Sequence, residues 1–317
     1  MVVGHAEGTP CLEPSGDACD FYGRYREDIA LQGDLGYNAF RFGIEWARIE
    51  PAEGEFSRAE LAHYRRLLAA CHEHRITPIV TFHHFTLPLW LHHQGGFTSP
   101  RFPELFERFC DRAAARPQYE DGAQPGESGF ELESRISDRY FELAREDDFI
   151  GVQTYTRFRI GPEGPRGPGH EWSDLSRELT ETDETTQMGY EYYPQALGGA
   201  IRRAWKSAGG VPILVTENGI ATSFDEKRIR YMDTAMCETL ACIAEGIDVR
   251  GYIYWSLLDN FEWSFGYRPT FGLIAVDRQT LTRRPRPSAY WFGEAARNVP
   301  TTSPWGARPA SDVRNSR

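Results

Sequence analysis

Short apolar runs that alternate with amphipathic segments constrain the fold of this chain more than any other feature. Five of these runs are rich in β-branched and aromatic residues, and they cover residues 38–44, 77–82, 149–155, 211–216 and 250–256. Strands that are covered on both faces read as continuous apolar runs of this kind. Strands that alternate with helical patterns predict βα units and a parallel α/β sheet.

The intervening segments predict helices at 57–74, 103–115, 134–145 and 226–245. The first of these opens with Ser-Arg-Ala-Glu, a capping-box pattern. Residues 116–129 are polar and rich in turn formers, and residues 161–169 form a second Pro- and Gly-rich stretch, so both are predicted to be loops. The second and third apolar runs are therefore separated by a length that would hold about two βα units, yet no strand pattern lies between them.

Length and charge limit the class of protein. The 317 residues are 40% apolar, and 26% are charged, which is ordinary for one large soluble core. The net charge of −11 argues against nucleic acid or an anionic membrane as a partner. The sequence shows no apolar run near the roughly 20 residues that a bilayer span needs, and no secretion signal. We therefore expect a cytoplasmic protein, with its six cysteines reduced.

Polar and aromatic side chains gather where the predicted strands end. The run 212–219 reads Pro-Ile-Leu-Val-Thr-Glu-Asn-Gly, so it delivers Glu217 at the end of a buried strand. In a parallel α/β barrel, catalytic groups lie at the carboxyl ends of the strands. A carboxylate there can attack a sugar carbon if a second carboxylic acid protonates the leaving group. Aromatic residues at the other strand ends suit the apolar face of a sugar.

Several segments together resemble glycoside hydrolase family 1, in particular β-glucosidases of the actinobacterial type. They are YREDIALQGDLGYNAFRFGIEWARIEPAEGEF, TPIVTFHHFTLPLWL, DDFIGVQTYTR, ILVTENG and GYIYWSLLDNFEWSFGYRPTFGLIAVD. The resemblance covers most of residues 14 to 297 and implies a TIM-type (β/α)8 barrel. We expect a single barrel domain over residues 1–300 and a disordered tail over 301–317.

The resemblance assigns a role to each matching residue. Glu217 matches the catalytic nucleophile, Tyr155 the tyrosine that orients it, and Arg41 the arginine that keeps it ionised. The positions that bind the non-reducing sugar are matched by His84, Trp255, Glu262 and Trp263. Tyr267 would close the same pocket near the 6-position of the sugar.

The chain also departs from the family pattern. The family's general acid/base is the Glu of an Asn-Glu-Pro motif after the fourth strand, and no Asn-Glu-Pro occurs in this sequence. The resemblance resumes near Ser137, so the fourth and fifth βα units are expected to be missing and the barrel to be incomplete. Either a smaller ring closes or, as we favour, the sheet stays open between the second and third predicted strands. Gln153 stands where many relatives have Asn.

The sequence therefore predicts a retaining β-glycosidase that acts on small-molecule β-glycosides through Glu217 and is impaired by the missing acid. A non-catalytic sugar-binding protein that keeps the pocket is the alternative, and a deletion product that does not fold is a third reading. The sequence predicts no cofactor and no metal site, because no cysteine or carboxylate completes a ligand set with the histidines. It assigns neither an oligomeric state nor a preference between glucose and galactose.

Overall fold

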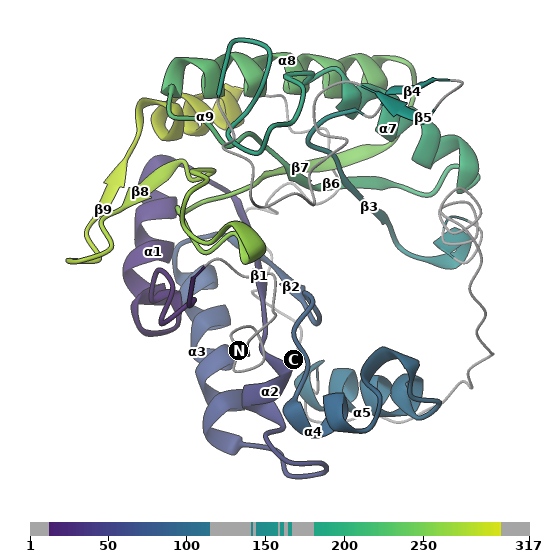
Figure 1. Ribbon diagram of the computed structural model, residues 1–317, viewed down its shortest axis with the longest axis vertical. Coiled ribbons are helices and arrows are strands. Elements are labelled where there is room, and N and C mark those ends of the chain that lie inside the picture. The colour runs from purple at the N-terminus through teal and green to yellow at the C-terminus, as the bar shows by residue number, and fades with distance from the viewer. Residues whose placement is uncertain are drawn as a thin grey trace, which may run out of the picture. The chain divides into compact units, whose positions relative to one another are not determined.

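The computed structural model describes residues 13–114, 141, 144–157, 159–161, 164–166 and 181–298. The chain divides into two compact units. Phe21–Phe130 belong to the first unit, and Val2–Asp20 together with Glu131–Arg317 belong to the second. Each unit has its own buried apolar clusters, so each is described by itself (Figure 1).

The first unit contains a pair of parallel strands, β1 (Ala39–Gly43) and β2 (Thr77–Thr81). Its helices are α1 (Phe21–Leu35), α2 (Trp46–Ile49), α3 (Arg58–Glu73), α4 (Leu89–His93) and α5 (Phe102–Ala114), with a 3-10 turn at η2 (Gly96–Thr98). The N-cap half of the predicted capping box is present, because the Ser57 side chain accepts a hydrogen bond from the backbone N–H of Glu60. The reciprocal half is not formed, because the Ser57 N–H donates to the carbonyl oxygen of Ile49.

Helices α1 and α3 supply buried residues to one apolar cluster of the first unit, which also takes in Phe42 of β1. A second cluster is built around Trp46 and Phe109, whose rings stack at 4.7 Å. Glu50 holds this region together, since its buried carboxylate accepts hydrogen bonds from the Trp46 indole, the Gly54 N–H and Arg108. A buried carboxylate is tolerated only when it is paired and hydrogen-bonded in this way.

The second unit is built on a parallel three-stranded sheet with the order β3-β6-β7. The strands are β3 (Ile150–Gln153), β6 (Ile213–Asn218) and β7 (Val249–Tyr254). Two antiparallel hairpins accompany the sheet. The first pairs β4 (Arg159–Gly161) with β5 (Gly164–Arg166), and the second pairs β8 (Ile274–Val276) with β9 (Arg283–Pro285).

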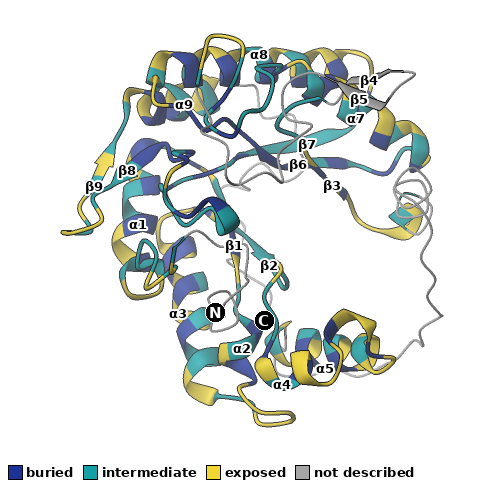
Figure 2. Ribbon diagram, in the orientation of Figure 1, coloured by how far each residue is buried: buried dark blue, intermediate teal, exposed yellow. Residues whose placement is uncertain are grey.

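Three helices lie along one side of this sheet: α7 (Ala196–Ser207), α8 (Asp225–Ala244) and α9 (Pro287–Asn298) (Figure 1). Short 3-10 turns occur at η3 (Ala144–Glu146) and η4 (Trp263–Phe265). Apolar residues of α7, α8 and the strands form one core that includes Leu197, Ile213, Val215 and Tyr231 (Figure 2). Because the strands pack against this core, the backbone at each strand end has a fixed position, and so has the Cα atom of a side chain there. None of the described helices is long and apolar enough to cross a bilayer.

Most of the predicted strands and helices that fall within the described residues are present. All five predicted strands are present, with bounds shifted by no more than a few residues. The helices predicted at 57–74, 103–115 and 226–245 are also present. The prediction of a loop at 161–169 is partly wrong, because the β4–β5 hairpin occupies that stretch. The predicted loop at 116–129 and most of the predicted helix at 134–145 lie outside the described residues, as does the predicted tail.

Candidate active site

The candidate site is built around Glu217, near the carboxyl end of the central strand β6. Its side chain is buried, with the residue 6% exposed. The Tyr155 hydroxyl donates to Oε2 at 2.5 Å, and Nε2 of Gln153 donates to Oε1 at 3.0 Å. Both oxygens of the Glu217 carboxylate therefore accept a hydrogen bond, which fixes the direction of the side chain.

The environment of Tyr155 keeps its hydroxyl protonated. Burial, followed by the negative charge of Glu217, raises the pKa of the Tyr155 hydroxyl well above its ordinary value. The tyrosine therefore stays protonated and keeps a hydrogen to donate. Its backbone carbonyl accepts a hydrogen bond from Tyr231 at 2.9 Å, and its ring packs edge-on against Phe271.

Asn218, next to Glu217, connects all three strands of the sheet. Its Nδ2 donates to the carbonyl oxygen of Thr154 beyond β3, and its Oδ1 accepts a hydrogen bond from the Tyr252 hydroxyl on β7 at 2.7 Å. Asn218 is fully buried, so each of these contacts is shielded from water. The Asn of the Thr-Glu-Asn-Gly run thus fixes the strand end that carries Glu217.

Aromatic and apolar residues form a cluster beside Glu217. Its buried members are Met188, Ala221, Phe265 and Phe271, and partly buried Tyr155, Tyr190 and Trp255 pack against them. A cluster of this composition provides the apolar surface that a sugar ring needs. It joins Trp255, predicted to bind the sugar, to Tyr155 and to a residue that the sequence did not indicate, Tyr190.

Glu262 adds a second carboxyl group to this site. Burial raises its pKa to about 7; the charge of Glu217 adds to that rise, and a hydrogen bond from the Trp255 side chain opposes it. Within the described part of the chain, the buried Oε2 of Glu262 has no hydrogen-bond partner. An unsatisfied buried oxygen is costly, and a ligand hydroxyl could donate to it.

The other predicted residues of the second unit have different surroundings. Trp263 begins the 3-10 turn η4 in a left-handed backbone conformation, with φ of 47°. The Tyr267 hydroxyl donates to the carbonyl oxygen of Ser15, and the Arg278 guanidinium lies 3.3 Å from the centre of its ring. Tyr267 also lines a cavity of about 230 Å³ together with Cys19 and Asp259. Its predicted place near the 6-position of a sugar stays a prediction.

Arg41 and His84 belong to the first unit. Arg41 lies within β1 opposite Ile79 of β2, and His84 follows β2, where its ring meets Phe85 edge-on. Both side chains are partly buried. Their roles beside Glu217 stay predictions from the resemblance, whereas the structure brings together Glu217, Tyr155, Trp255 and Glu262 within the second unit.

Two residues near Glu217 were not assigned roles from the sequence. Gln153 was noted only as a departure from the usual Asn, although the Gln at that strand position already implied a donor beside Glu217. Tyr190 lies in a segment without strand or helix pattern, so no local signal placed it in the aromatic cluster. Burial raises the pKa of Tyr190 to about 12, and the charge of Glu262 adds to the rise.

Comparison with known proteins identifies relatives along nearly the whole chain. The crystal structure of β-glycosidase BGL167 is 39% identical, with a TM-score of 0.80 over 97% of this chain and 93% of that one. The apo structure of β-glucosidase 1317 is 34% identical, with a TM-score of 0.76 over 93% and 92% of the two chains. Thermostable β-glucosidase B of Thermobispora bispora is 28% identical over 93% of this chain and 84% of its own length.

The chain is shorter than these relatives. Its alignment with β-glucosidase A of Thermotoga maritima, at 25% identity, spans 410 positions and takes in 93% of this chain and 90% of the relative. About 115 of those positions, 410 less 93% of 317, therefore face gaps in this chain. The solved relatives have the TIM-barrel fold, so the predicted α/β barrel class is confirmed, and the shorter length agrees with an incomplete barrel.

The family model of glycosyl hydrolase family 1 matches residues 10–121 and 126–299. The break in the match falls inside the stretch 116–129, where the sequence pattern loses its resemblance. The match takes in Tyr155, Glu217 and Glu262, which the structure groups in one site. The chain belongs to glycosyl hydrolase family 1.

Proposed function

We propose that the chain is a retaining β-glycosidase of the β-glucosidase type, with Glu217 as its nucleophile. The observation that carries this proposal is the buried Glu217 carboxylate, which accepts a 2.5 Å hydrogen bond from Tyr155 beside an aromatic cluster. Support comes from relatives named β-glucosidase and β-glycosidase.

In the first step, a carboxylate oxygen of Glu217 forms a bond to the anomeric carbon of a β-D-glucoside. The bond from that carbon to the leaving-group oxygen breaks, and the oxygen takes the electron pair. In the second step, a water oxygen forms a bond to the same carbon and the bond to Glu217 breaks, which returns the carboxylate. The proton that the water loses goes to the solvent. Two displacements on one carbon retain its configuration.

Tyr155 and Gln153 hold Glu217 during these steps. Both donate to its oxygens and so fix the direction of attack. Glu262 is proposed to bind the sugar, with its buried Oε2 accepting a hydrogen bond from a hydroxyl. Trp255 and Tyr190 would pack against the apolar parts of the sugar.

The missing Asn-Glu-Pro motif sets the expected level of activity. Without a general acid, an alkyl glycoside must lose its leaving group unprotonated, a loss of about 10²–10⁴-fold. A nitrophenyl leaving group needs little protonation, so Glu217 would still be glycosylated by a nitrophenyl glucoside. The second step would then be slow, because no base activates the water.

The test is a pair of measurements on nitrophenyl β-D-glucoside and cellobiose. We expect slow release of nitrophenol that azide or formate accelerates, because a small anion can attack the glycosyl-enzyme without a base. Cellobiose should be cleaved very slowly. Hydrolysis of cellobiose as fast as that of the nitrophenyl glucoside would show that another group supplies the proton.

The absent acid also favours a second candidate, a sugar-binding protein without turnover. Incubation with 2-deoxy-2-fluoro-β-D-glucosyl fluoride separates the two, since fluoride leaves without a proton donor. A covalent adduct on Glu217, located by mass spectrometry of peptides, supports the enzyme. Saturable glucose binding with no adduct supports the binding protein.

A further inference from the structure

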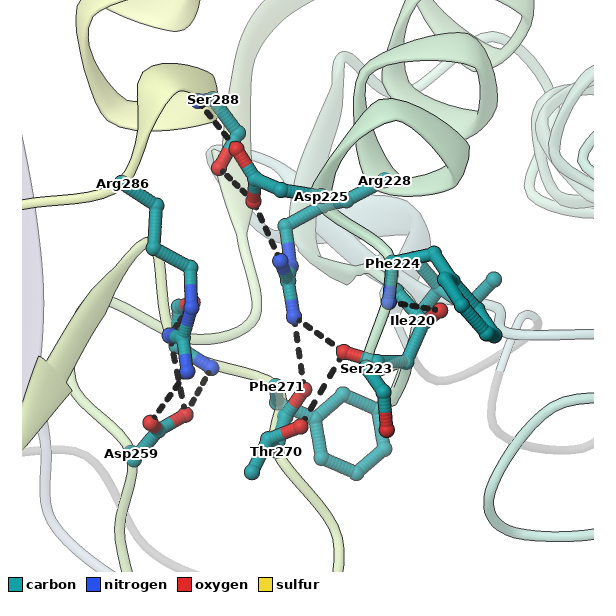
Figure 3. A network of polar contacts seen from close by, with 12 residues as sticks. Ile220, Ser223, Phe224, Asp225, Arg228, Asp259, Thr270, Phe271, Arg286 and Ser288 are labelled. Carbon is teal, nitrogen blue, oxygen red and sulfur yellow. Dashed lines mark hydrogen bonds and ion pairs between the residues drawn. The ribbon is translucent and has the colours of Figure 1, made fainter. Parts of the chain in front are cut away.

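Two loops that border the candidate site are fastened to each other by a buried arginine outside it. The loop 219–224 follows the nucleophile strand β6, and the loop 255–273 follows β7 and carries Glu262. Nη2 of Arg228, on α8, donates to the carbonyl oxygens of Thr222 and Thr270 at 2.8 and 2.9 Å (Figure 3). One guanidinium nitrogen therefore bridges both loops.

The charge of Arg228 is balanced within the same network. Its Nη1 forms an ion pair with Asp225 at 2.5 Å, and Arg228 is fully buried. Asp225 also accepts hydrogen bonds from the backbone N–H and hydroxyl of Ser288 at the start of α9, at 2.7 and 2.6 Å (Figure 3). Nη1 and Nη2 of Arg228 thus both have partners, whereas its buried Nε has no hydrogen-bond partner among the described residues. The contacts of the two Nη atoms restrict the position of the guanidinium.

Other contacts bridge the same two loops. The Tyr254 hydroxyl, on β7, lies 3.4 Å from the Ile220 carbonyl oxygen and 3.2 Å from that of Phe271. The Thr270 hydroxyl donates to the Thr222 carbonyl oxygen at 3.1 Å. Three side chains thus connect the backbone of Ile220 and Thr222, three and five residues after Glu217, to the backbone of Thr270 and Phe271, eight and nine residues after Glu262.

A third loop, 181–192, joins this arrangement and carries Tyr190. Oε1 of Gln187 accepts hydrogen bonds from the N–H and hydroxyl of Thr270, and its Nε2 donates to Ser223 at 2.7 Å. The Gln187 N–H donates to the Ala221 carbonyl oxygen. Arg228 and its ion-pair partner Asp225 are the charged members of this network. The hydrogen bonds of Arg228 go to Asp225, Thr222 and Thr270, none of which is assigned to the sugar.

We propose that Arg228 is a positioning residue, which fixes the distance between Glu217 and Glu262 by holding their loops together. This inference rests on the proposed function, because it assumes that one carboxylate attacks the sugar that the other binds. A fixed separation matters since a shift of about 1 Å in reacting groups can cost about a hundredfold in rate. The role needs an arginine, because its planar fork reaches two carbonyls and an aspartate at once, which a lysine ammonium cannot do with the same geometry.

The experiment measures the second-order rate at which 2-deoxy-2-fluoro-β-D-glucosyl fluoride inactivates the full chain by labelling Glu217. Arg228→Lys keeps the charge and is expected to slow labelling by about tenfold, within the range that misplacement produces. The control is Arg202→Lys, which breaks a bidentate ion pair with Glu245 on the surface of α7 and α8, away from the site. Labelling by the control should equal that of the unchanged chain.

A double variant distinguishes a positioning role of Arg228 from a general effect on stability, because it measures the coupling between Arg228 and Glu262. If Arg228 acts through the placement of Glu262, the double variant Arg228→Lys, Glu262→Gln should label no more than about twofold slower than Glu262→Gln alone, since coupled residues are non-additive. Additive losses in the double variant would overturn the proposal. Should Arg228→Lys fail to fold, Tyr254→Phe takes its place, because it removes a different bridge between the same loops.

The two possible failures can be told apart. If the unchanged chain is not labelled at all, the proposed function fails. If the unchanged chain is labelled and Arg228→Lys is labelled at the same rate, the proposed function stands and the positioning role is wrong.

Discussion

The carbonyl oxygen of Trp255 lies 1.9 Å from the point at which a Cβ on Gly219 would sit. Glycine is thus required directly after Asn218, because any side chain would clash with the backbone of Trp255, the first residue after β7. The close approach brings the backbone that follows β6 and Glu217 against the backbone of Trp255, the first residue after β7.

Gly219→Ala is therefore expected to destabilise the protein by about 1–3 kcal/mol or more, the usual cost of forcing extra atoms into a packed region. Urea unfolding measures this change. The matched control is Gly199→Ala on the exposed face of α7, where an added Cβ meets nothing within 4 Å. The control should be stabilising by about 0.5–1 kcal/mol, because alanine favours a helix. Equal stability of the two variants would contradict the close approach.

Tyr155→Phe should slow the labelling of Glu217 while leaving the fold intact. The variant removes the 2.5 Å hydrogen bond to Oε2 and leaves the Gln153 contact in place. A hydrogen bond to a charged group contributes about 1.5–3 kcal/mol, so a loss of about 10- to 100-fold in the inactivation rate is expected. Tyr290→Phe, at an exposed tyrosine of α9, serves as the control. An unchanged rate in Tyr155→Phe would show that Gln153 alone orients the nucleophile.

Glu262→Gln should change the pH dependence of stability. Burial raises the Glu262 pKa in the folded protein to about 7. Its contribution to stability is therefore fully present below the unfolded pKa of about 4.3, and it is lost as pH rises through about 7. The glutamine variant should thus match the unchanged chain near pH 4 and exceed it near pH 8, by up to about 3 kcal/mol.

Thermal unfolding at several pH values measures this difference, with Glu294→Gln on the exposed face of α9 as control. Glu262→Gln should also weaken glucose binding, because the amide offers one acceptor oxygen where the carboxylate offers two. If stability near pH 8 is the same with Glu or Gln at position 262, the buried environment described for this carboxyl is wrong.

His63→Phe should protect the first unit against acid. His63 is 6% exposed, with the Tyr22 ring stacked on it at 3.9 Å, and its Nε2 has no hydrogen-bond partner among the described residues. Burial lowers the pKa of His63, opposed by Glu60 and aided by Arg66 and Arg48. Its stabilising contribution is present above the unfolded pKa of about 6.5 and is lost as pH falls through the lowered folded value.

Phenylalanine keeps the ring contacts and cannot take up a proton. The gain in unfolding temperature should therefore grow as the pH is lowered from about 8 to about 5, across the titration range of histidine. His72→Gln, at an exposed position of the same helix, is the control. A gain that is the same at both pH values would indicate a packing effect and rule out the titration.

Sequence patterns predicted the strands of the second unit because strands depend on local signals, whereas the roles of the site residues come from the family resemblance and stay predictions. The apolar run ending in Glu217 marks the strand, and the motif around Trp255 marks the loop after it. The β4–β5 hairpin was missed because its Pro and Gly residues favour loops, although proline is tolerated in a short edge strand.

Contacts between residues far apart in the sequence could not be predicted from local patterns. Tyr267 and Ser15 are 252 positions apart, and Tyr190 reaches the aromatic cluster from an irregular segment. Arg228 looked like any charged residue on an amphipathic helix, and only folding buries it against two loops. Such roles depend on tertiary packing, which residue periodicity does not encode.

The contacts of Asn218 bear on how a Thr-Glu-Asn-Gly motif in a genome sequence should be interpreted. The asparagine ties together three strands whether or not a sugar is ever cleaved, so selection for a stable fold alone would preserve it. A side chain at position 219 would meet the carbonyl oxygen of Trp255, so the same selection would preserve the glycine. The Asn-Gly half of the motif therefore serves the architecture, and it would outlast the loss of turnover in a lineage.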